Sequence, residues 1–255
     1  MNSPQDDKDS FFIGWAETSR ADRRRYLKLG LGLVATSGTL GFGLAVLQPT
    51  PGKGRWDPDV VREWRGLVTG EPYAMLRTKD LGAGPSTVLL SCLGKCGVAA
   101  RIGALSGQAV IVTGSLIQRG QNAMIAVDEA GPWIRRDETI QPDTSLRFPS
   151  SELLGEVELT GEILDSKCWF GAMRPSEGKV HKSCASLCIR GGIPPAFFVR
   201  GPGNQGSLMM MSSEGRAYGP ELLSLVGDPV RLRGRVFRQG NLLWLDTALK
   251  DIRRI

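Results

Sequence analysis

The chain repeats itself, and this internal repeat limits the folds open to it more than any other feature of the sequence. Three short blocks from the first half recur in the second half in the same order. The matched pairs are residues 66–70 with 157–161, 86–90 with 207–211, and 105–114 with 225–234. Chance similarity between β-rich segments would not be expected to keep three blocks in one order. The sequence therefore predicts one architecture built twice.

Each copy reads as a series of short β-strands. Apolar and polar residues alternate within the blocks, and glycine marks the turns between them, which is typical of antiparallel strands. The chain has 33 glycines among its 255 residues, in keeping with many tight turns. We therefore expect a mainly β protein with two tandem, small, OB-like antiparallel barrels at residues 59–150 and 151–255, after a linker at 51–58.

The charge pattern of the chain argues against nucleic acid as a partner. Its formal net charge is +6, and much of the excess lies in an N-terminal cluster and in the last few residues. Aromatic residues make up 7% of the chain, and no basic run carries interleaved aromatic residues. A clustered basic surface is the usual footprint of a nucleic-acid-binding domain. We therefore expect no nucleic-acid binding.

The second copy contains a long insertion where the first copy has only a short connection. Ser86 follows Gly70 by 16 residues, whereas Ser207 follows Gly161 by 46 residues. The additional residues form the segment 165–195, in which a short helix is expected. A barrel does not need such an insertion to fold, and long connections in compact domains are more often functional than structural. The alternative is that the insertion only covers an open face of the barrel.

The insertion holds three of the five cysteines and the only histidine of the chain. His181, Cys184 and Cys188 have the spacing H-x2-C-x3-C, which places all three on one face if residues 179–190 are helical. Cys168 lies upstream and can supply a fourth ligand. Thiolate and imidazole ligands suit zinc, copper as Cu(I), or iron. The pattern therefore predicts a Cys3His metal site made of these four residues.

Neighbouring residues fit this helix and this site. Gly191 is placed to end the helix as a left-handed C-cap, and two prolines follow it. Asp165 is expected to orient the loop or His181, and Met173 is a further candidate for a soft ligand. Cations near the cysteines would favour thiolate over thiol, although they could equally be an ordinary solvated face. These cations are Lys167, Lys179, Lys182 and Arg190.

Two other uses of these cysteines stay open. Cysteines of exported proteins often pair, and a disulfide from Cys168 to Cys184 or Cys188 would staple the insertion. A thiol oxidoreductase with Cys184 or Cys188 as nucleophile and His181 as base is a third hypothesis, and the only one of the three that makes the chain an enzyme.

Cys92 and Cys96 flank a Gly-Lys turn in the first copy, and the matching turn of the second copy has no cysteine. In an oxidising compartment this pair is expected to form a small hairpin disulfide. The alternative is a redox pair that exchanges with the cysteines of the insertion.

The N-terminus carries the pattern of an export signal. Residues 1–28 are polar and end in the basic sequence RRRYLK at 23–28, and residues 29–50 form an uncharged, mildly apolar run with several glycines. This arrangement resembles a twin-arginine signal. The run is close to the ~20 residues that span a bilayer, and no cleavage site is evident, so we expect an uncleaved single-pass anchor. Residues 1–28 would then stay in the cytoplasm, and both barrels would face the periplasm from the bacterial inner membrane.

Two resemblances suggest a setting for the protein. The tethered arrangement resembles the anchored subunits of respiratory complexes such as Rieske proteins, although a single histidine cannot build a Rieske centre. The insertion motif D-x2-C…H-x2-C-A-x2-C-I-x-G-G resembles one carried by exported bacterial OB-like proteins of unassigned function. That resemblance implies a periplasmic setting and supplies no reaction.

Together these features predict a membrane-anchored periplasmic accessory protein with a Cys/His metal-binding or thiol-redox site. Its partner would be a protein of a membrane redox complex. The alternative is a structural or interaction subunit, without catalysis, whose cysteines form stabilising disulfides.

Overall fold

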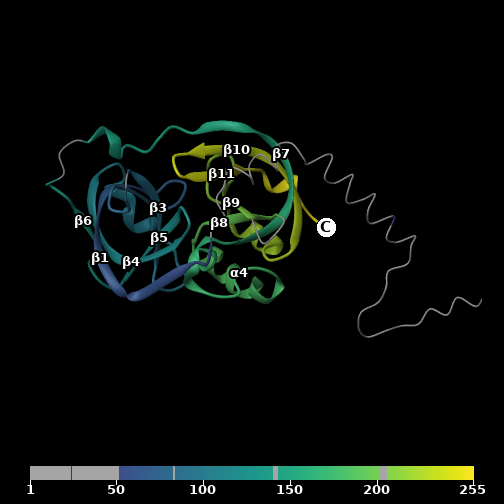
Figure 1. Cartoon of the computed structure of the whole chain (residues 1–255), viewed down its shortest axis with the longest axis horizontal. Coiled ribbons are helices and arrows are strands. Elements are labelled where there is room, and N and C mark those ends of the chain that lie inside the picture. The colour runs from purple at the N-terminus through teal and green to yellow at the C-terminus, as the bar shows by residue number, and fades with distance from the viewer. Residues whose placement is uncertain (1–23, 25–51, 83, 140–142, 202–205) are drawn as a thin grey trace, which may run out of the picture. The chain divides into compact units, whose positions relative to one another are not determined.

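A computed structural model describes residues 24, 52–82, 84–139, 143–201 and 206–255. The expected cytoplasmic tail at 1–28 and the expected anchor at 29–50 lie outside the described residues, except for Arg24. In the described part of the chain, no helix is long and apolar enough to cross a membrane. This part is mainly β, with two closed five-stranded barrels and few helices (Figure 1). The predicted mainly β fold with two barrels is confirmed.

The first barrel is built from the first copy of the repeat. Its elements are β1 (Arg55–Thr69), β2 (Met75–Thr78), β3 (Ser86–Cys92), α3 (Ala99–Ile102), η1 (Gly103–Leu105), β4 (Ala109–Arg119), β5 (Asn122–Val127), β6 (Ile134–Arg136) and η2 (Thr144–Leu146). The strand order is β1-β2-β3-β5-β4, pairing of β1 with β4 closes the ring, and β6 pairs with β4. Strand β1 begins at Arg55, so part of the expected linker already belongs to the barrel.

The second barrel repeats this order with the second copy. Its elements are β7 (Glu152–Asp165), β8 (Pro195–Arg200), β9 (Gly206–Ser212), η6 (Pro220–Leu225), β10 (Pro229–Gln239), β11 (Leu242–Asp246), η7 (Leu249–Asp251) and β12 (Ile252–Arg254). The ring is β7-β8-β9-β11-β10, closed by β10 with β7, and β12 pairs with β10. Each strand therefore has a counterpart six places earlier in the first barrel.

The expectation that all strand pairs are antiparallel is wrong for one pair in each barrel. Strands β3 and β5 are parallel, and so are β9 and β11. The reason is geometric. Strand directions cannot alternate all the way around a closed ring with an odd number of members, so five strands require at least one parallel pair.

The strand pairing also corrects the alignment of the first repeat block. Gly66 lies opposite Val110, and Gly161 lies opposite Val230, which is the counterpart of Val110. Gly161 therefore corresponds to Gly66 and not to Gly70. A Cβ atom at Gly66 would clash with the Arg77 carbonyl oxygen, and one at Gly161 would clash with that of Phe198. Both glycines thus permit the same close approach to the next strand.

Each barrel has its own apolar interior, and a third apolar cluster joins the two barrels to the insertion. The buried members of this shared cluster include Tyr73, Met75, Leu89, Ile117 and Met124 from the first barrel, Phe198, Leu208, Met210 and Trp244 from the second, and Cys168, Trp169, Phe170 and Cys188 from the insertion. Burial of large side chains contributes about 1.5–3 kcal/mol each. The insertion therefore packs as part of a core shared by both barrels.

The insertion contains three short helical segments: η3 (Cys168–Ala172), a π-helical turn, then η4 (Lys179–His181), a 3-10 turn, and α4 (Lys182–Arg190). The predicted helix over 179–190 is therefore α-helical only from Lys182. Gly191 ends α4 with right-handed backbone angles, φ −76° and ψ −4°, and the left-handed residue is Gly192 with φ +96°. The prediction of a left-handed cap was one residue too early.

Candidate metal centre

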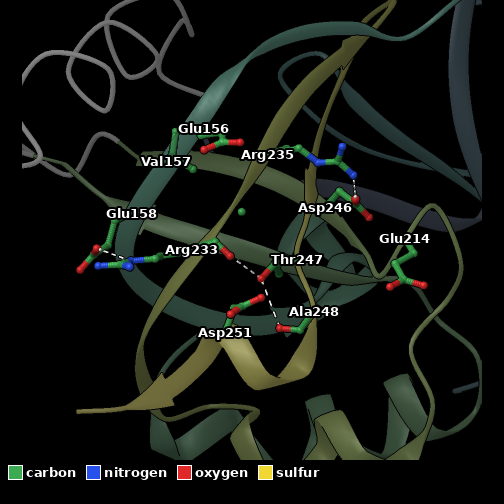
Figure 2. Close-up of a pocket in the computed structure, with 11 residues that line it drawn as sticks. Glu156, Val157, Glu158, Glu214, Arg233, Arg235, Asp246, Thr247, Ala248 and Asp251 are labelled. Carbon is green, nitrogen blue, oxygen red and sulfur yellow. Dashed lines mark hydrogen bonds and ion pairs between the residues drawn. The ribbon is translucent and has the colours of Figure 1, made fainter.

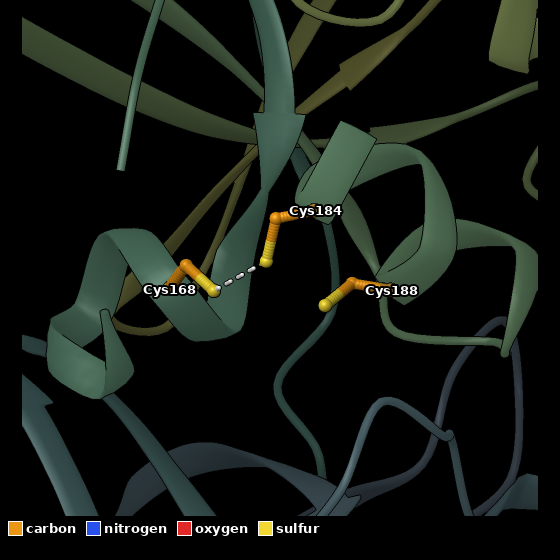
Figure 3. A group of neighbouring side chains, drawn as sticks. All are labelled: Cys168, Cys184 and Cys188. Carbon is orange, nitrogen blue, oxygen red and sulfur yellow. Dashed lines mark hydrogen bonds between the residues drawn. The ribbon is translucent and has the colours of Figure 1, made fainter. Parts of the chain in front are cut away.

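Three cysteine sulfurs of the insertion converge at one point. Cys168 opens η3 directly after β7, and Cys184 and Cys188 lie one turn apart on α4, so all three side chains face the space between the two segments (Figure 3). The Sγ atoms of Cys168 and Cys184 are 3.9 Å apart, and all three sulfurs lie within 4.8 Å of one another. None of the three is in a disulfide. We call them the thiol cluster.

The spacing of these sulfurs suits a metal ion. A metal–sulfur bond of about 2.3 Å in a tetrahedral or trigonal site sets neighbouring sulfurs about 3.8–4.0 Å apart. The Cys168–Cys184 distance of 3.9 Å falls in this range, whereas a disulfide needs about 2.05 Å. The cluster could therefore hold a metal ion with little movement of the chain.

The three thiols differ in burial, and Cys168 and Cys188 also differ in the direction in which their pKa is shifted. Cys168 and Cys188 are buried, with 4% and 1% of their surface exposed, and Cys184 is half-buried. The neighbouring Cys168 thiol lowers the pKa of Cys188, whereas Cys188 together with burial raises the pKa of Cys168. Cys188 is therefore the first of this pair to become a thiolate, and Cys184 is the sulfur that solvent can reach.

His181 does not complete one compact group with all three sulfurs. Its Nε2 atom lies 2.9 Å from Oδ2 of Asp165, and both side chains are almost fully buried. Asp165, Cys168 and His181 form a second group whose ligand atoms lie within 4.8 Å of one another. Cys168 is the member that the two groups share. The expected orienting role of Asp165 is confirmed, because the same carboxylate also accepts a hydrogen bond of 2.8 Å from the backbone N–H of Cys168.

A loop of the first barrel covers the thiol cluster. Cys92 and Cys96 form the predicted disulfide, and we call residues 92–96 the disulfide loop. Since both sulfurs are bonded to each other, neither offers a thiolate for the neighbouring Glu129 group. Lys167 of the insertion donates hydrogen bonds of 2.6, 2.8 and 2.8 Å to the carbonyl oxygens of Cys92, Leu93 and Gly94. The loop is thus tied to the residue next to Cys168.

The cation nearest to a cluster thiol comes from this loop. Lys95 Nζ donates to Cys184 Sγ at 3.3 Å, and this hydrogen bond raises the pKa of Lys95. Sequence reasoning did not find Lys95 as a site residue, although its position between the two cysteines of the loop was visible. The expected cations behave differently: Lys167 binds carbonyl groups, and Lys182 pairs with Asp228 at 2.8 Å.

Glycines allow the loop to approach the end of α4. The backbone N–H of Gly97 donates to the carbonyl oxygen of Gly191 at 2.8 Å. A Cβ atom on Gly191 would clash with the carbonyl oxygen of Lys95, and one on Gly97 would clash with that of Gly192. The Gly-Gly pair after the cysteines therefore makes room for the disulfide loop, in addition to ending the helix.

Met173 adds a fourth sulfur at the solvent side of the cluster. Its Sδ atom lies 3.6 Å from Cys184 Sγ, and the side chain is 45% exposed. The structure therefore brings the expected soft-ligand candidate to the one cluster thiol that solvent can reach.

A separate cavity of about 570 Å³ lies on the second barrel, and its lining residues differ in chemistry from the thiol cluster (Figure 2). No cysteine or histidine lines it. Both of its arginines pair with lining carboxylates, Arg233 with Glu158 at 2.7 Å and Arg235 with Asp246 at 2.9 Å. This cavity offers no thiol, thioether or imidazole among its lining residues, so the thiol cluster is the better candidate for function.

Comparison with known proteins adds no family. A scan against protein-family models finds no match to the chain, and a search of the curated proteins finds none either.

Proposed function

We propose that the chain is an exported, membrane-anchored accessory protein that binds one soft metal ion through Cys168, Cys184 and Cys188. The observation that carries this proposal is the convergence of three unpaired sulfurs at metal–thiolate spacing. Thiolates are soft ligands that prefer Cu(I) and zinc. An iron–sulfur cluster usually takes four cysteines, so three sulfurs favour a single ion.

Each neighbour of the cluster has a role in this proposal. Three thiolates carry more negative charge than a single Cu(I) or zinc ion neutralises, and Lys95 at 3.3 Å from Cys184 offsets part of the excess. The Asp165–His181 pair fixes the backbone and the surroundings of Cys168, as outer residues commonly do around metal ligands. Met173 supplies a thioether as a further soft donor on the exposed side.

The setting of the site is proposed from the sequence. The basic segment at 23–28 and the uncharged run at 29–50 support export with an uncleaved anchor. Two barrels with the strand order 1-2-3-5-4 support the OB-like assignment, an architecture that often uses its loops for binding. A soft-metal site on a tethered periplasmic protein suits an accessory subunit of a membrane redox complex.

Metal content measured together with free thiols tests this function. The full chain is purified in detergent without chelator, beside Cys184→Ser and the double variant Cys92→Ser/Cys96→Ser. Near-stoichiometric copper or zinc is expected in the wild type, lost in Cys184→Ser and kept in the double variant, which removes the cysteines that lie outside the cluster. A metal-free wild type in which two cluster cysteines are oxidised to a disulfide would refute the proposal and favour the disulfide-braced scaffold.

A further inference from the structure

A smaller cavity opens directly beside the thiol cluster. Its volume is about 250 Å³, and Cys168 and Met173 both contribute to its wall. The other lining residues are Lys53, Gly54, Arg119, Trp169, Gly171, Arg174, Pro175, Ser176 and Glu177. At about 30 Å³ per water molecule, this volume corresponds to roughly eight waters. The cavity therefore suits a small ion and excludes a large cofactor.

The wall of this cavity is strongly cationic. Lys53, Arg119 and Arg174 line it, and none of them forms an ion pair with the described residues. The one acidic lining residue, Glu177, is already paired with Arg200, which lies outside the lining. Three positive charges thus face a space in which no free carboxylate balances them.

Backbone carbonyl groups hold the two guanidinium groups in place. Arg119 donates to the carbonyl oxygens of Gly52 at 2.9 Å and Trp169 at 3.1 Å, and its guanidinium carbon lies 4.0 Å from the centre of the Trp169 ring. Arg174 donates to the carbonyl oxygen of Gly54 at 2.8 Å. Each guanidinium has five N–H groups, so both keep free donors after these contacts. The site is therefore preorganised to donate hydrogen bonds.

The ring of Trp169 forms part of the wall. Trp169 is only 1% exposed, and the guanidinium carbon of Arg119 lies 4.0 Å from the centre of its ring. An anion in the cavity would supply the negative charge that the described lining residues do not provide.

We propose that this cavity is a binding site for a small oxyanion, held by Lys53, Arg119 and Arg174. The inference deepens the proposed function, on which it rests in one respect: an anion held here lies next to Cys168 and so next to a metal bound by the thiol cluster. An oxyanion that also carries a soft sulfur atom can then use both features, because its oxygens meet the cations while its sulfur meets the metal.

The test uses the indole N–H of Trp169 as its reporter. Sulfate is titrated into the metal-free, 15N-labelled full chain in detergent at constant ionic strength, and the indole resonances are followed by NMR. Trp169→Phe identifies the resonance, since this variant keeps an aromatic ring and lacks the indole N–H. The Trp169 resonance is expected to shift with a dissociation constant on the order of 1 mM, a typical value for a weak small-ion site.

Charge-matched variants locate the site. Arg174→Ala and Lys53→Ala are each expected to weaken sulfate binding about tenfold, because each removes a charged contact. Both side chains are exposed, so neither change should unfold the barrel. Arg231→Ala removes an exposed arginine of β10, outside this cavity, and is expected to leave sulfate binding unchanged. A Trp169 resonance that does not move, or equal weakening in Arg231→Ala, would overturn the anion site.

Thiosulfate tests the position of the site relative to the metal. It differs from sulfate by one sulfur atom, and it is expected to bind the metal-loaded chain at least about tenfold more tightly than sulfate does. Equal affinity of the two anions for the loaded chain would refute the contact with the metal. Because sulfate is titrated into the metal-free chain, the anion site and the metal site fail or succeed separately.

Discussion

Replacing Gly191 with alanine tests whether the motif glycines serve the helix or the contact between the barrels. Gly191 ends α4 with backbone angles that any residue adopts. If only the helix mattered, alanine would stabilise the protein by up to about 1 kcal/mol, because it loses less conformational entropy on folding. The structure predicts the opposite sign.

The clash with the disulfide loop determines this sign. The added Cβ atom would lie 3.0 Å from the carbonyl carbon of Lys95 and still closer to its oxygen, whereas ordinary contacts begin at 3.4 Å. The end of α4 must then move away from the loop by roughly 1 Å, which lengthens the 2.8 Å Gly97–Gly191 hydrogen bond beyond the usual limit of about 3.2 Å. Overpacking costs about 1–3 kcal/mol and a lost buried hydrogen bond about 1–3 kcal/mol. After the gain in helix propensity, we expect a net loss of about 3 kcal/mol.

Urea unfolding of the full chain in detergent, followed by circular dichroism, measures this loss. The matched control is Gly84→Ala, where an added Cβ atom meets nothing within 4 Å, and where the change should be neutral or stabilising by up to about 1 kcal/mol. A Gly191→Ala protein as stable as the wild type would show that the loop does not press against the helix end, and the account of the Gly-Gly pair would fail.

Two further changes test the buried charge contacts. Lys167→Met leaves three carbonyl groups of the disulfide loop without their donor. The variant is expected to lose about 3 kcal/mol of unfolding free energy in the same urea assay. A loss below about 1 kcal/mol would contradict the assigned contacts. The second change is Asp246→Asn. Burial of the Asp246 carboxylate would raise its pKa, but hydrogen bonds from Gly215, Arg235 and Ser212 outweigh this effect. The pKa of Asp246 therefore lies below the ordinary 3.8. This carboxylate therefore stabilises the fold above pH 3.8 and loses that contribution as the pH falls through its lowered pKa. Melting temperatures of Asp246→Asn should accordingly depend less on pH in this acidic range than those of the wild type, and identical pH dependence would contradict the assignment.

The repeat made the fold predictable, because alternation and glycine turns are local signals. The alignment of its first block was not predictable, since residues 67–70 (LVTG) and 158–161 (ELTG) look alike but lie four positions apart in the strand pairing. Which strands become neighbours is a non-local property, and so the parallel pairs were also missed. Closure of an odd-numbered ring explains them only once the ring is known.

The pairing of Cys184 with Cys188 in the thiol cluster was predictable for the same local reason, because the two residues are one helical turn apart. His181 was misplaced since it lies in a 3-10 turn before α4, and a turn of 3.0 residues directs a side chain differently from one of 3.6. Lys95 was missed because it lies 89 residues before its partner Cys184. No spacing pattern in the sequence connects the two residues.

The disulfide loop makes the surroundings of the thiol cluster depend on both halves of the chain. All three cluster thiols belong to the second half of the chain, yet the lysine beside Cys184 and the carbonyl groups that hold Lys167 belong to the first. A recombination event that transferred the second half alone would carry every cysteine of the motif to a new host protein. It would leave behind Lys95 and the disulfide loop, so the transferred motif would match in sequence without the same surroundings.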